Sequence, residues 1–330
     1  MAIIEVENLV KTYKIIEKED GLLGYFKNLV KPQYKEFTAV NNINFKVEEG
    51  ELIGYIGENG AGKSTTIKML TGLLTPTLGK VIVNGIVPNE KRMKNNQNIG
   101  AVFGQKTQLW WDLPVIESFR LIKKMYQIPE GEYRKNLKKF TQVLQLEELL
   151  NKQVKNLSLG QKMRCEIAAT FLHNPKIVYL DEPTIGLDVL VKENIRNFIK
   201  EINKEKNTTV ILTTHDLKDI EDVCNRIILL DKGQIIYDGE KQNFKDEYGK
   251  NTIAEFIVTD KKQNIKNENN EMFEILEETD EKIKLKFEHN KTTIMKVMNE
   301  ISNYCIVEDI HMKETELEDI LKEIYKGAKI

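Results

Sequence analysis

The chain has 330 residues, enough for one large domain with a smaller companion or for two domains. Its net charge of −2, with 41% hydrophobic and 30% charged residues, is ordinary for a globular protein and gives no overall field that attracts nucleic acid or anionic lipid. Without a run of about 18 apolar residues or a basic and apolar N-terminal leader, we expect neither a membrane span nor a secretory signal. The odd number and wide spacing of Cys165, Cys224 and Cys305 predict reduced cytosolic thiols rather than disulfides or a zinc site.

Residues 1 to about 240 alternate between strand-like and helix-like segments. We expect strands over residues 3–6, 45–47, 52–56, 80–83, 99–103, 177–180, 209–213, 226–230 and 234–237. We expect helices over residues 64–70, 116–126, 132–144, 158–173, 192–203 and 216–223. This alternation predicts an α/β fold in which helices cover a largely parallel sheet.

The composition becomes polar after residue 245, so residues 241–270 are expected to form a linker. The strand and helix patterns then resume, and they predict a small α+β domain over residues 271–330. Its expected strands are residues 271–277, 282–288 and 305–311, and its expected helices are residues 292–304 and 315–325. Dimerisation and regulation both remain open as roles for this domain.

A phosphate-binding loop pattern lies between an expected strand and an expected helix. It consists of Gly57, Glu58, Asn59, Gly60, Ala61, Gly62, Lys63 and Ser64. Glycines let the backbone approach a phosphate chain closely, and the N–H groups of such a loop form a nest for anionic oxygens. A lysine adds a positive charge and a serine offers its hydroxyl to Mg²⁺, so the pattern predicts binding of a nucleotide phosphate.

Two acids follow the apolar strand expected at residues 177–180. Mg²⁺ prefers oxygen ligands and keeps several waters, so Asp181 at the strand end is a candidate for the metal site. Glu182 is then a candidate base that polarises a water molecule toward the γ-phosphate. Further upstream, Ser158 is a good N-cap for a long helix.

The order of these motifs resembles that of the nucleotide-binding subunit of ATP-binding cassette (ABC) transporters, over residues 1 to about 240. The matching segments are Walker A (57–64), the Q-loop glutamine (105), the signature (157–161), Walker B (177–181), the D-loop (186–188) and the switch histidine (215). The resemblance implies a P-loop NTPase fold, an ABC ATPase cassette with a RecA-like core and a helical subdomain at about residues 106–172.

More narrowly, residues 104–114, 184–188 and 315–320 resemble the ATPases of type 2 ABC exporters, in the daunorubicin-resistance and viologen-exporter-like branch. One departure is Leu159, which stands where the family signature has its first glycine. Its side chain must point away from the phosphates if the site is to work.

The resemblance also implies the roles of individual residues. The implied catalytic residues are Glu182, His215 and Lys63, and the implied ligands of Mg²⁺ are Ser64, Gln105 and Asp181. The expected ATP contacts are residues 57–64 with Tyr13, Thr65 and Gln105, together with Ser158, Gly160, Gln161 and Asp188. Tyr13 would stack on adenine, although Tyr34 and Phe37 compete for that role.

The implied assembly is a head-to-tail homodimer with two ATP molecules at its interface, bound to integral-membrane permease subunits and to no nucleic acid. The implied location is the cytoplasmic face of the cell membrane, as a peripheral protein. The alternatives are a soluble ABC ATPase that acts on DNA or ribosomes, and a P-loop nucleotide kinase or GTPase. The latter would lack the signature and the His215 context.

Two further segments carry open interpretations. Residues 15–36 look inserted, and an apolar helical face with nearby lysines within them favours a helix packed on its own domain or, alternatively, one lying on a membrane surface. Trp110 and Trp111 follow the Q-loop, where the family's helical region meets the permease. We expect one of these two rings to be buried and the other exposed.

Overall fold

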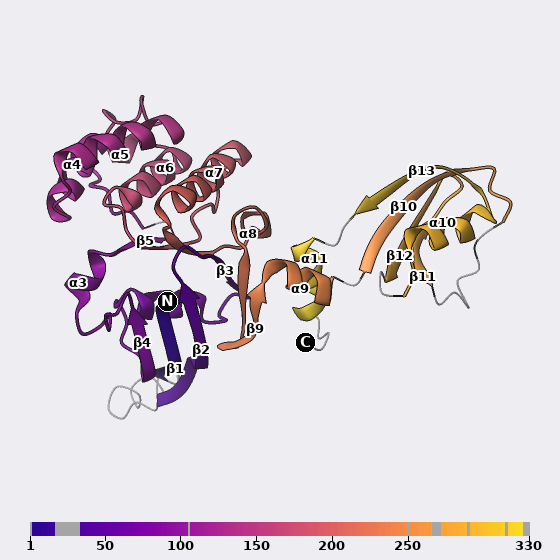
Figure 1. The fold of residues 1–330 in the computed structure, drawn as a ribbon, viewed down its shortest axis with the longest axis horizontal. Helices are drawn as coiled ribbons and strands as arrows, with labels where there is room; N and C mark the ends of the chain where they lie inside the picture. Colours follow the sequence, from indigo (N-terminus) through magenta and orange to yellow (C-terminus); the bar gives the residue numbers. More distant parts are fainter. Residues whose placement is uncertain are drawn as a thin grey trace, which may run out of the picture. The chain divides into compact units, whose positions relative to one another are not determined.

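The computed structural model describes residues 2–16, 34–104, 106–249, 251–263, 265, 272–288, 291–313 and 316–325. The chain divides into two compact units, Met1–Gly239 and Glu240–Ile330 (Figure 1). Among the helices in the described part of the chain, none combines the length and apolar character that crossing a bilayer requires.

A six-stranded sheet forms the centre of the first unit. Its strands are β3 (Leu52–Gly57), β5 (Ile99–Phe103), β6 (Ile177–Asp181), β7 (Thr209–Thr213), β8 (Arg226–Asp231) and β9 (Gln234–Glu240). The order is β5-β6-β7-β3-β8-β9, and the neighbouring pairs from β5 to β8 are parallel. Every residue of β6 and β7 is buried, as parallel strands covered on both faces should be. The predicted parallel core is confirmed.

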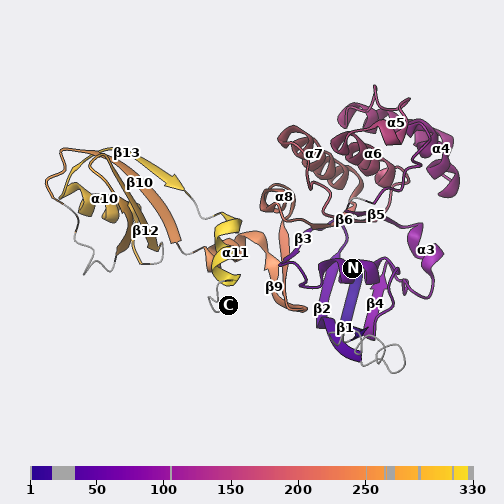
Figure 2. The same cartoon turned by 180° about the vertical axis from the view of Figure 1, so that it is seen from behind.

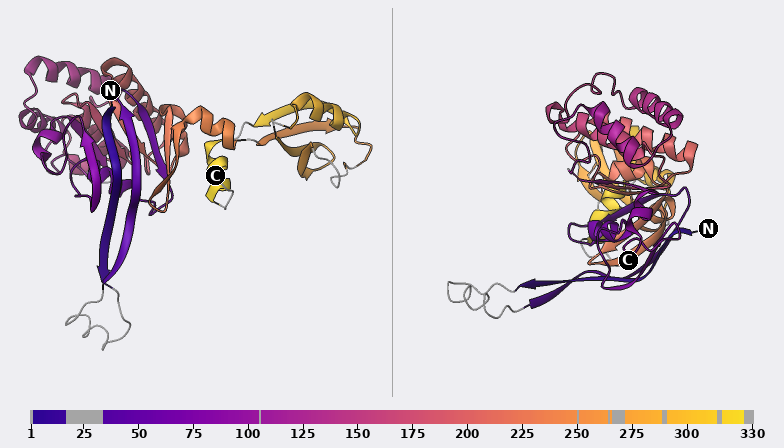
Figure 3. Two further views of the ribbon diagram at one scale, coloured as in Figure 1. Left: turned by 60° about the horizontal axis from the view of Figure 1, so that its bottom comes forward. Right: turned by 90° about the vertical axis from the view of Figure 1, so that its left-hand side faces the viewer.

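A second, antiparallel sheet of the first unit contains β1 (Ala2–Ile16), β2 (Tyr34–Glu48) and β4 (Leu78–Val83), in the order β2-β1-β4. The pairing of β1 with β2 runs from Ala2 and Glu48 to Ile16 and Tyr34, and Figure 3 shows the resulting long two-stranded ribbon. The ends of the expected insertion are therefore strand. The amphipathic segment proposed within it falls in residues 17–33, outside the described residues.

Helix α2 (Lys63–Leu70) joins the two sheets of the first unit. It contacts β2 and β4 in one sheet and β3 and β6 in the other. Ile67, Met69 and Leu70 are buried in the core that the two sheets share, and each such side chain contributes about 1.5–3 kcal/mol through removal from water. This packing fixes the first turn of α2 at the carboxyl end of β3.

The remaining helices of the first unit are α3 (Arg92–Asn96), α4 (Val115–Met125), α5 (Glu130–Val143), α6 (Leu159–Phe171), α7 (Val189–Lys206) and α8 (Leu217–Val223). Figures 1 and 2 show α4 to α7 gathered on the side of the six-stranded sheet away from the antiparallel sheet. The ring of Phe198 on α7 meets Phe140 and Phe171 edge to face, with centroids 5.1 and 5.2 Å apart. This aromatic contact holds α5, α6 and α7 together.

The second unit contains α9 (Lys241–Tyr248), β10 (Asn251–Thr259), β11 (Phe273–Glu278), β12 (Lys282–Glu288), α10 (Ile294–Ser302), β13 (Ile306–Lys313) and α11 (Leu317–Tyr325). Its four strands form an antiparallel sheet in the order β11-β12-β10-β13. The predicted linker over residues 241–270 is therefore wrong in its first half, where α9 and β10 lie. Alternate residues of β10 enter the core of this unit, among them Ala254, Phe256 and Val258.

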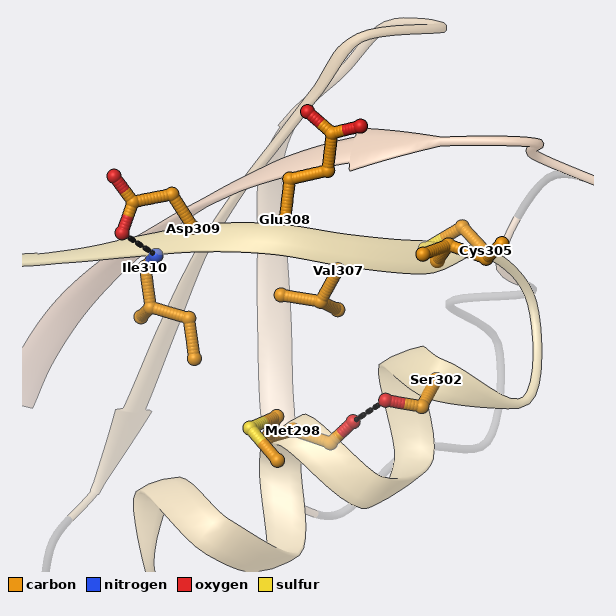
Figure 4. A pocket seen from close by; sticks show the side chains of 8 residues that line it. Met298, Ser302, Cys305, Val307, Glu308, Asp309 and Ile310 are labelled. Carbon is orange, nitrogen blue, oxygen red and sulfur yellow. Dashed lines mark hydrogen bonds between the residues drawn. The ribbon is translucent and has the colours of Figure 1, made fainter.

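Strand β13 is the last strand on its side of this sheet within the described residues, and a groove of about 630 Å³ separates it from α10 (Figure 4). The Oδ1 atom of Asp309 accepts a hydrogen bond of 2.7 Å from the N–H of Ile310, and the register with β10 shifts beside it, between Ile257 and Val258. Local charges and bulges of this kind protect edge strands from pairing with further strands.

Candidate functional site

The loop of residues 57–64 leaves the carboxyl end of β3 and leads into α2. Its backbone needs glycine at two places. Gly62 has φ = 102°, and a Cβ there would lie 2.5 Å from the carbonyl oxygen of Ala39 in β2. A Cβ at Gly57 would lie 2.5 Å from the carbonyl oxygen of Leu230 in β8. Gly60 has open space around it, so the outer side of the loop is left without a side chain and its backbone remains accessible.

Lys63 begins α2, and its side chain folds back over the loop. Its Nζ donates to the carbonyl oxygens of Gly57, at 2.6 Å, and Glu58, at 3.0 Å. The residue is 6% exposed, and burial lowers the pKa of Lys63 while the nearby Glu182 and Asp181 carboxylates oppose that change. The two acceptors are neutral carbonyls, so these bonds leave a concentrated positive charge at the loop, which suits a phosphate.

Asp181, at the end of β6, is hydrogen-bonded to α2, to β7 and to the residue after β5. Its Oδ1 accepts hydrogen bonds from the hydroxyls of Ser64, at 3.2 Å, and Thr213, at 2.5 Å. Its backbone carbonyl accepts the N–H of Gly104 at 2.8 Å. A serine hydroxyl beside a buried carboxylate is the oxygen donor set that Mg²⁺ favours, so these residues fit the metal. Gln105, the other expected ligand, follows Gly104 and lies outside the described residues.

Glu182 and His215 stand at the ends of neighbouring strands, β6 and β7. The Nε2 atom of His215 lies 2.8 Å from Oε1 of Glu182, and the two side chains are 45% and 26% exposed. Glu182 has φ = 56°, and its N–H donates to the carbonyl oxygen of Thr213 at 2.9 Å. A left-handed backbone at a non-glycine residue costs energy, and here the bonded strand end sustains it, which directs the carboxylate out of the sheet.

The expected signature residues lie at the start of α6. The Oγ of Ser158 accepts the N–H of Gln161 at 3.3 Å, and the N–H of Ser158 donates to Oε1 of Gln161 at 3.1 Å, which completes a capping box. The side chain of Leu159 lies against the D-loop of the same chain, with Cδ2 3.1 Å from where a Cβ would stand on Gly186. Asp188 follows and caps α7 through the N–H of Val191 at 2.9 Å.

Tyr13 is half-buried on β1, where its cross-strand partner is Phe37 on β2. The Nζ of Lys11 lies 5.4 Å from the centre of the tyrosine ring. Phe37 and Tyr34 are themselves exposed, so all three aromatic candidates for adenine stacking belong to the β1–β2 ribbon. Thr65, the remaining loop-end candidate, is half-buried in the first turn of α2.

Both tryptophans after the Q-loop are exposed, by 38% at Trp110 and 52% at Trp111, so the expectation that one of them is buried is wrong. The exposed Trp111 ring has a cationic neighbour, because the Nζ atom of Lys162 on α6 lies 5.3 Å from its centre. The Trp110 N–H donates to the hydroxyl of Ser118 at 3.1 Å, which fixes the backbone of this segment on α4.

Sequence reasoning missed Glu166, a buried carboxylate on α6. It accepts the N–H of Gln108 at 3.2 Å and the hydroxyl of Thr107, so it fastens the segment after Gln105 to the signature helix. Burial raises the pKa of Glu166, and the bonds from Thr107 and Gln108 counteract part of that effect. The signal available in the sequence was a glutamate between Cys165 and a run of apolar residues. A buried carboxylate needs hydrogen-bond partners, so such a residue indicates a polar contact inside the fold.

Comparison with known proteins agrees with this geometry. A family model described as ABC transporter matches residues 40–185. The linearmycin resistance ATP-binding protein LnrL of Bacillus subtilis is 34% identical over 230 residues, which cover 70% of this chain and 73% of that protein. ABC transporter A family member 1 of Dictyostelium discoideum is 32% identical over 240 residues, covering 72% of this chain but only 27% of that much longer protein.

Among solved structures, a dimeric ATP-binding cassette in a post-hydrolysis state with ADP and phosphate is 28% identical, with a TM-score of 0.60. The match covers 72% of this chain and 98% of that one. The fold and the site thus define an α/β P-loop ATPase. The chain belongs to the ABC transporter family, as an ATP-binding subunit, and its relatives are consistent with the type 2 exporter-like branch.

Proposed function

We propose that this subunit powers a membrane exporter through ATP-driven closure of a head-to-tail homodimer. The observation that carries the proposal is the Glu182–His215 pair, which stands at the same sheet edge as Lys63, Ser64 and Asp181. One site thus contains a candidate base, a cation that can bind phosphate and two side-chain oxygens suited to a metal ion. This combination fits the hydrolysis of a nucleoside triphosphate. The names of relatives as resistance and multidrug transport proteins support the direction of export.

Each residue of the site then has a defined task. The backbone of residues 57–64 and the ammonium of Lys63 hold the phosphates, and Thr65 adds a hydroxyl at the start of α2. Ser64, Asp181 and Gln105 would hold Mg²⁺, which supplies charge neutralisation at the phosphoryl oxygens. Glu182 withdraws a proton from the attacking water, and His215 keeps the Glu182 carboxylate in position through its ring nitrogen. Tyr13 stacks on adenine.

The second copy of the chain contributes the start of α6. Ser158 and Gln161 complete their own hydrogen bonds, while Gly160 offers backbone without a side chain, so the helix N-terminus can approach an anion on the partner. Asp188 stands next to this surface at the start of α7. A ligand shifts a conformational equilibrium only through different affinity for its two states, and the γ-phosphate provides that difference here.

The membrane partner is a permease, and the subunit lies peripherally on the cytoplasmic face of the membrane. The exposed Trp110 and Trp111 support this contact, because exposed aromatic side chains often anchor interfaces. A cavity of about 140 Å³ lies in the same unit between β5, α3 and α6, is lined by Leu73, Tyr126 and His173 among others, and has room for a side chain of the permease.

Two measurements test the proposal. Wild-type protein should hydrolyse ATP, and the tagged full chain, extracted from its native membranes in mild detergent, should retain integral-membrane proteins. Co-purification with nucleic acid or ribosomes, and without membrane proteins, would instead establish the alternative of a soluble ABC ATPase. The absence of ATP hydrolysis by the wild-type chain, both alone and with its co-purified partners, would remove the enzymatic role.

A further inference from the structure

Asp219 is a buried acid on α8 that joins two loops of the site. It is 1% exposed, and its Oδ2 accepts hydrogen bonds from the hydroxyl of Thr184 and, at 3.1 Å, from the hydroxyl of Thr214. Its Oδ1 accepts a hydrogen bond of 2.7 Å from Nε of Arg196 on α7. Helices α7 and α8 lie side by side in Figures 1 and 2. The Asp219 carboxylate thus accepts hydrogen bonds from three segments, which are α7, the loop with Thr184 and the loop with Thr214.

The two threonines belong to the loops that flank the Glu182–His215 pair. Thr184 lies two residues after Glu182 and four before Asp188, in the turn that leads to the expected partner contact. Thr214 directly precedes His215, and its Oγ1 also accepts the N–H of Asp216 at 3.0 Å. Because both hydroxyls bond the same oxygen atom, neither loop can move away from α8 without changing the surroundings of the other.

The charge of Asp219 is balanced where it stands. Arg196 is also buried, and its Nη1 donates to Oδ2 of Asp222 at 2.7 Å. A buried carboxylate that accepts three hydrogen bonds, one of them from a guanidinium, is held in a single orientation. The junction is therefore rigid, and a rigid shared acceptor is a means of coupling two segments.

We propose that Asp219 is a positioning residue that couples the D-loop, which contains Asp188, to the loop that carries His215. Engagement of Asp188 by a second copy of the chain is thereby transmitted through Thr184, Asp219 and Thr214 to the Glu182–His215 pair. Hydrolysis then depends on dimer closure even though Asp219 touches no substrate. This inference rests on the proposed roles of Glu182 and His215.

The test uses the threonine hydroxyls, because Asp219→Asn would also weaken the buried pairing with Arg196. Thr184→Val and Thr214→Val keep the side-chain shape but remove the donor, and Thr184→Ser and Thr214→Ser keep the donor. Thr208→Val is the matched control, since Thr208 is a buried threonine whose hydroxyl donates to the carbonyl of Pro175, at the opposite end of β7. The assay is steady-state ATP hydrolysis by the full-length chain.

Each valine variant should lower kcat by about tenfold or more while the KM for ATP stays within about twofold, since small displacements of catalytic groups have effects of this size. The serine variants and Thr208→Val should keep wild-type kcat. The Thr184→Val/Thr214→Val double variant should be no slower than the slower single variant, because both changes break one junction.

Wild-type kcat in both valine variants would overturn the coupling, as would an equal loss in Thr208→Val or fully multiplicative losses in the double variant. Failure of the proposed function has a different signature. In that case the wild-type chain does not hydrolyse ATP, or Glu182→Gln hydrolyses it at the wild-type rate.

Discussion

His215 and Glu182 form a hydrogen-bonded pair across two strand ends, with Nε2 and Oε1 2.8 Å apart. The two residues are separated by 33 positions in the chain and are brought together because β6 and β7 are parallel neighbours, with Asp181 paired to Thr213. Both side chains keep part of their surface open, so a water molecule can reach the carboxylate while the imidazole restrains it.

Glu182→Gln should slow ATP hydrolysis by about 10²–10⁴-fold, because the amide cannot accept the proton of the attacking water. The dissociation constant for ATP should change little, since the phosphate loop and Lys63 are untouched. Single-turnover hydrolysis and equilibrium nucleotide binding measure the two quantities. Wild-type turnover in this variant would remove Glu182 from its role.

Lys63→Ala should weaken ATP binding by at least about tenfold, because a charge-assisted contact to phosphate contributes about 1.5–3 kcal/mol. Lys68→Ala is the control, since Lys68 is an exposed lysine on the same helix. Fluorescence titration with a labelled ATP analogue gives both affinities. Equal affinities for the two variants would argue against the loop as the phosphate site.

The Gly160→Ala substitution should raise stability and lower activity. The backbone of Gly160 is compatible with any residue, and a Cβ there meets only ordinary contacts of 3.6 Å or more, to Val191 and Leu187. Alanine should therefore raise the unfolding free energy by about 0.4–1 kcal/mol, because it reduces the number of conformations open to the unfolded chain. If the start of α6 faces the partner's nucleotide, the added methyl group should nevertheless lower kcat. Thermal unfolding and ATPase assays on one preparation test both, and a stabilised variant of full activity would contradict the interface.

His173 should make the first unit less stable in mild acid. Burial lowers the pKa of His173 to about 4, and its bond to the Ile99 carbonyl opposes this change only in part. Between pH 6.5 and 4 the unfolded chain therefore binds a proton that the folded chain does not. The stabilisation is complete above pH 6.5 and is lost as the pH falls through this window, by up to about 3 kcal/mol.

His173→Gln should remove that part of the pH dependence. Urea unfolding at pH 7 and pH 5, followed by tryptophan fluorescence, reports on the first unit because both tryptophans, Trp110 and Trp111, lie in it. His311→Gln changes an exposed histidine of the second unit and should leave the difference as in the wild type. The same slope in all three proteins would exclude His173 as its source.

The phosphate loop and the strand-end acids could be predicted because their chemistry is local in sequence. Gly57 to Ser64 have their glycines where the backbone turns, and Asp181 ends a strand that is apolar throughout. The alternation of buried residues in β10, from Thr252 to Val258, was harder to read, because two of the three residues between the buried positions, Ile253 and Ile257, are also apolar.

Contacts between distant segments could not be predicted in this way. Nothing near Asp219 in the sequence indicates that Thr184 and Arg196 will reach it, because those contacts depend on the packing of α7 against α8. The long pairing of β1 with β2 likewise joins segments on either side of residues 17–33, and single-sequence patterns carry no register for such a pair.

The packing of Leu159 against Gly186 has a consequence for association. The contact fastens the start of α6 to the D-loop within one copy, and the two caps, Ser158 and Asp188, already satisfy the helix ends on either side. A surface that is preorganised before its partner arrives loses little conformational entropy when the partner binds. If two copies meet through it, as proposed, their association needs little prior ordering of either surface.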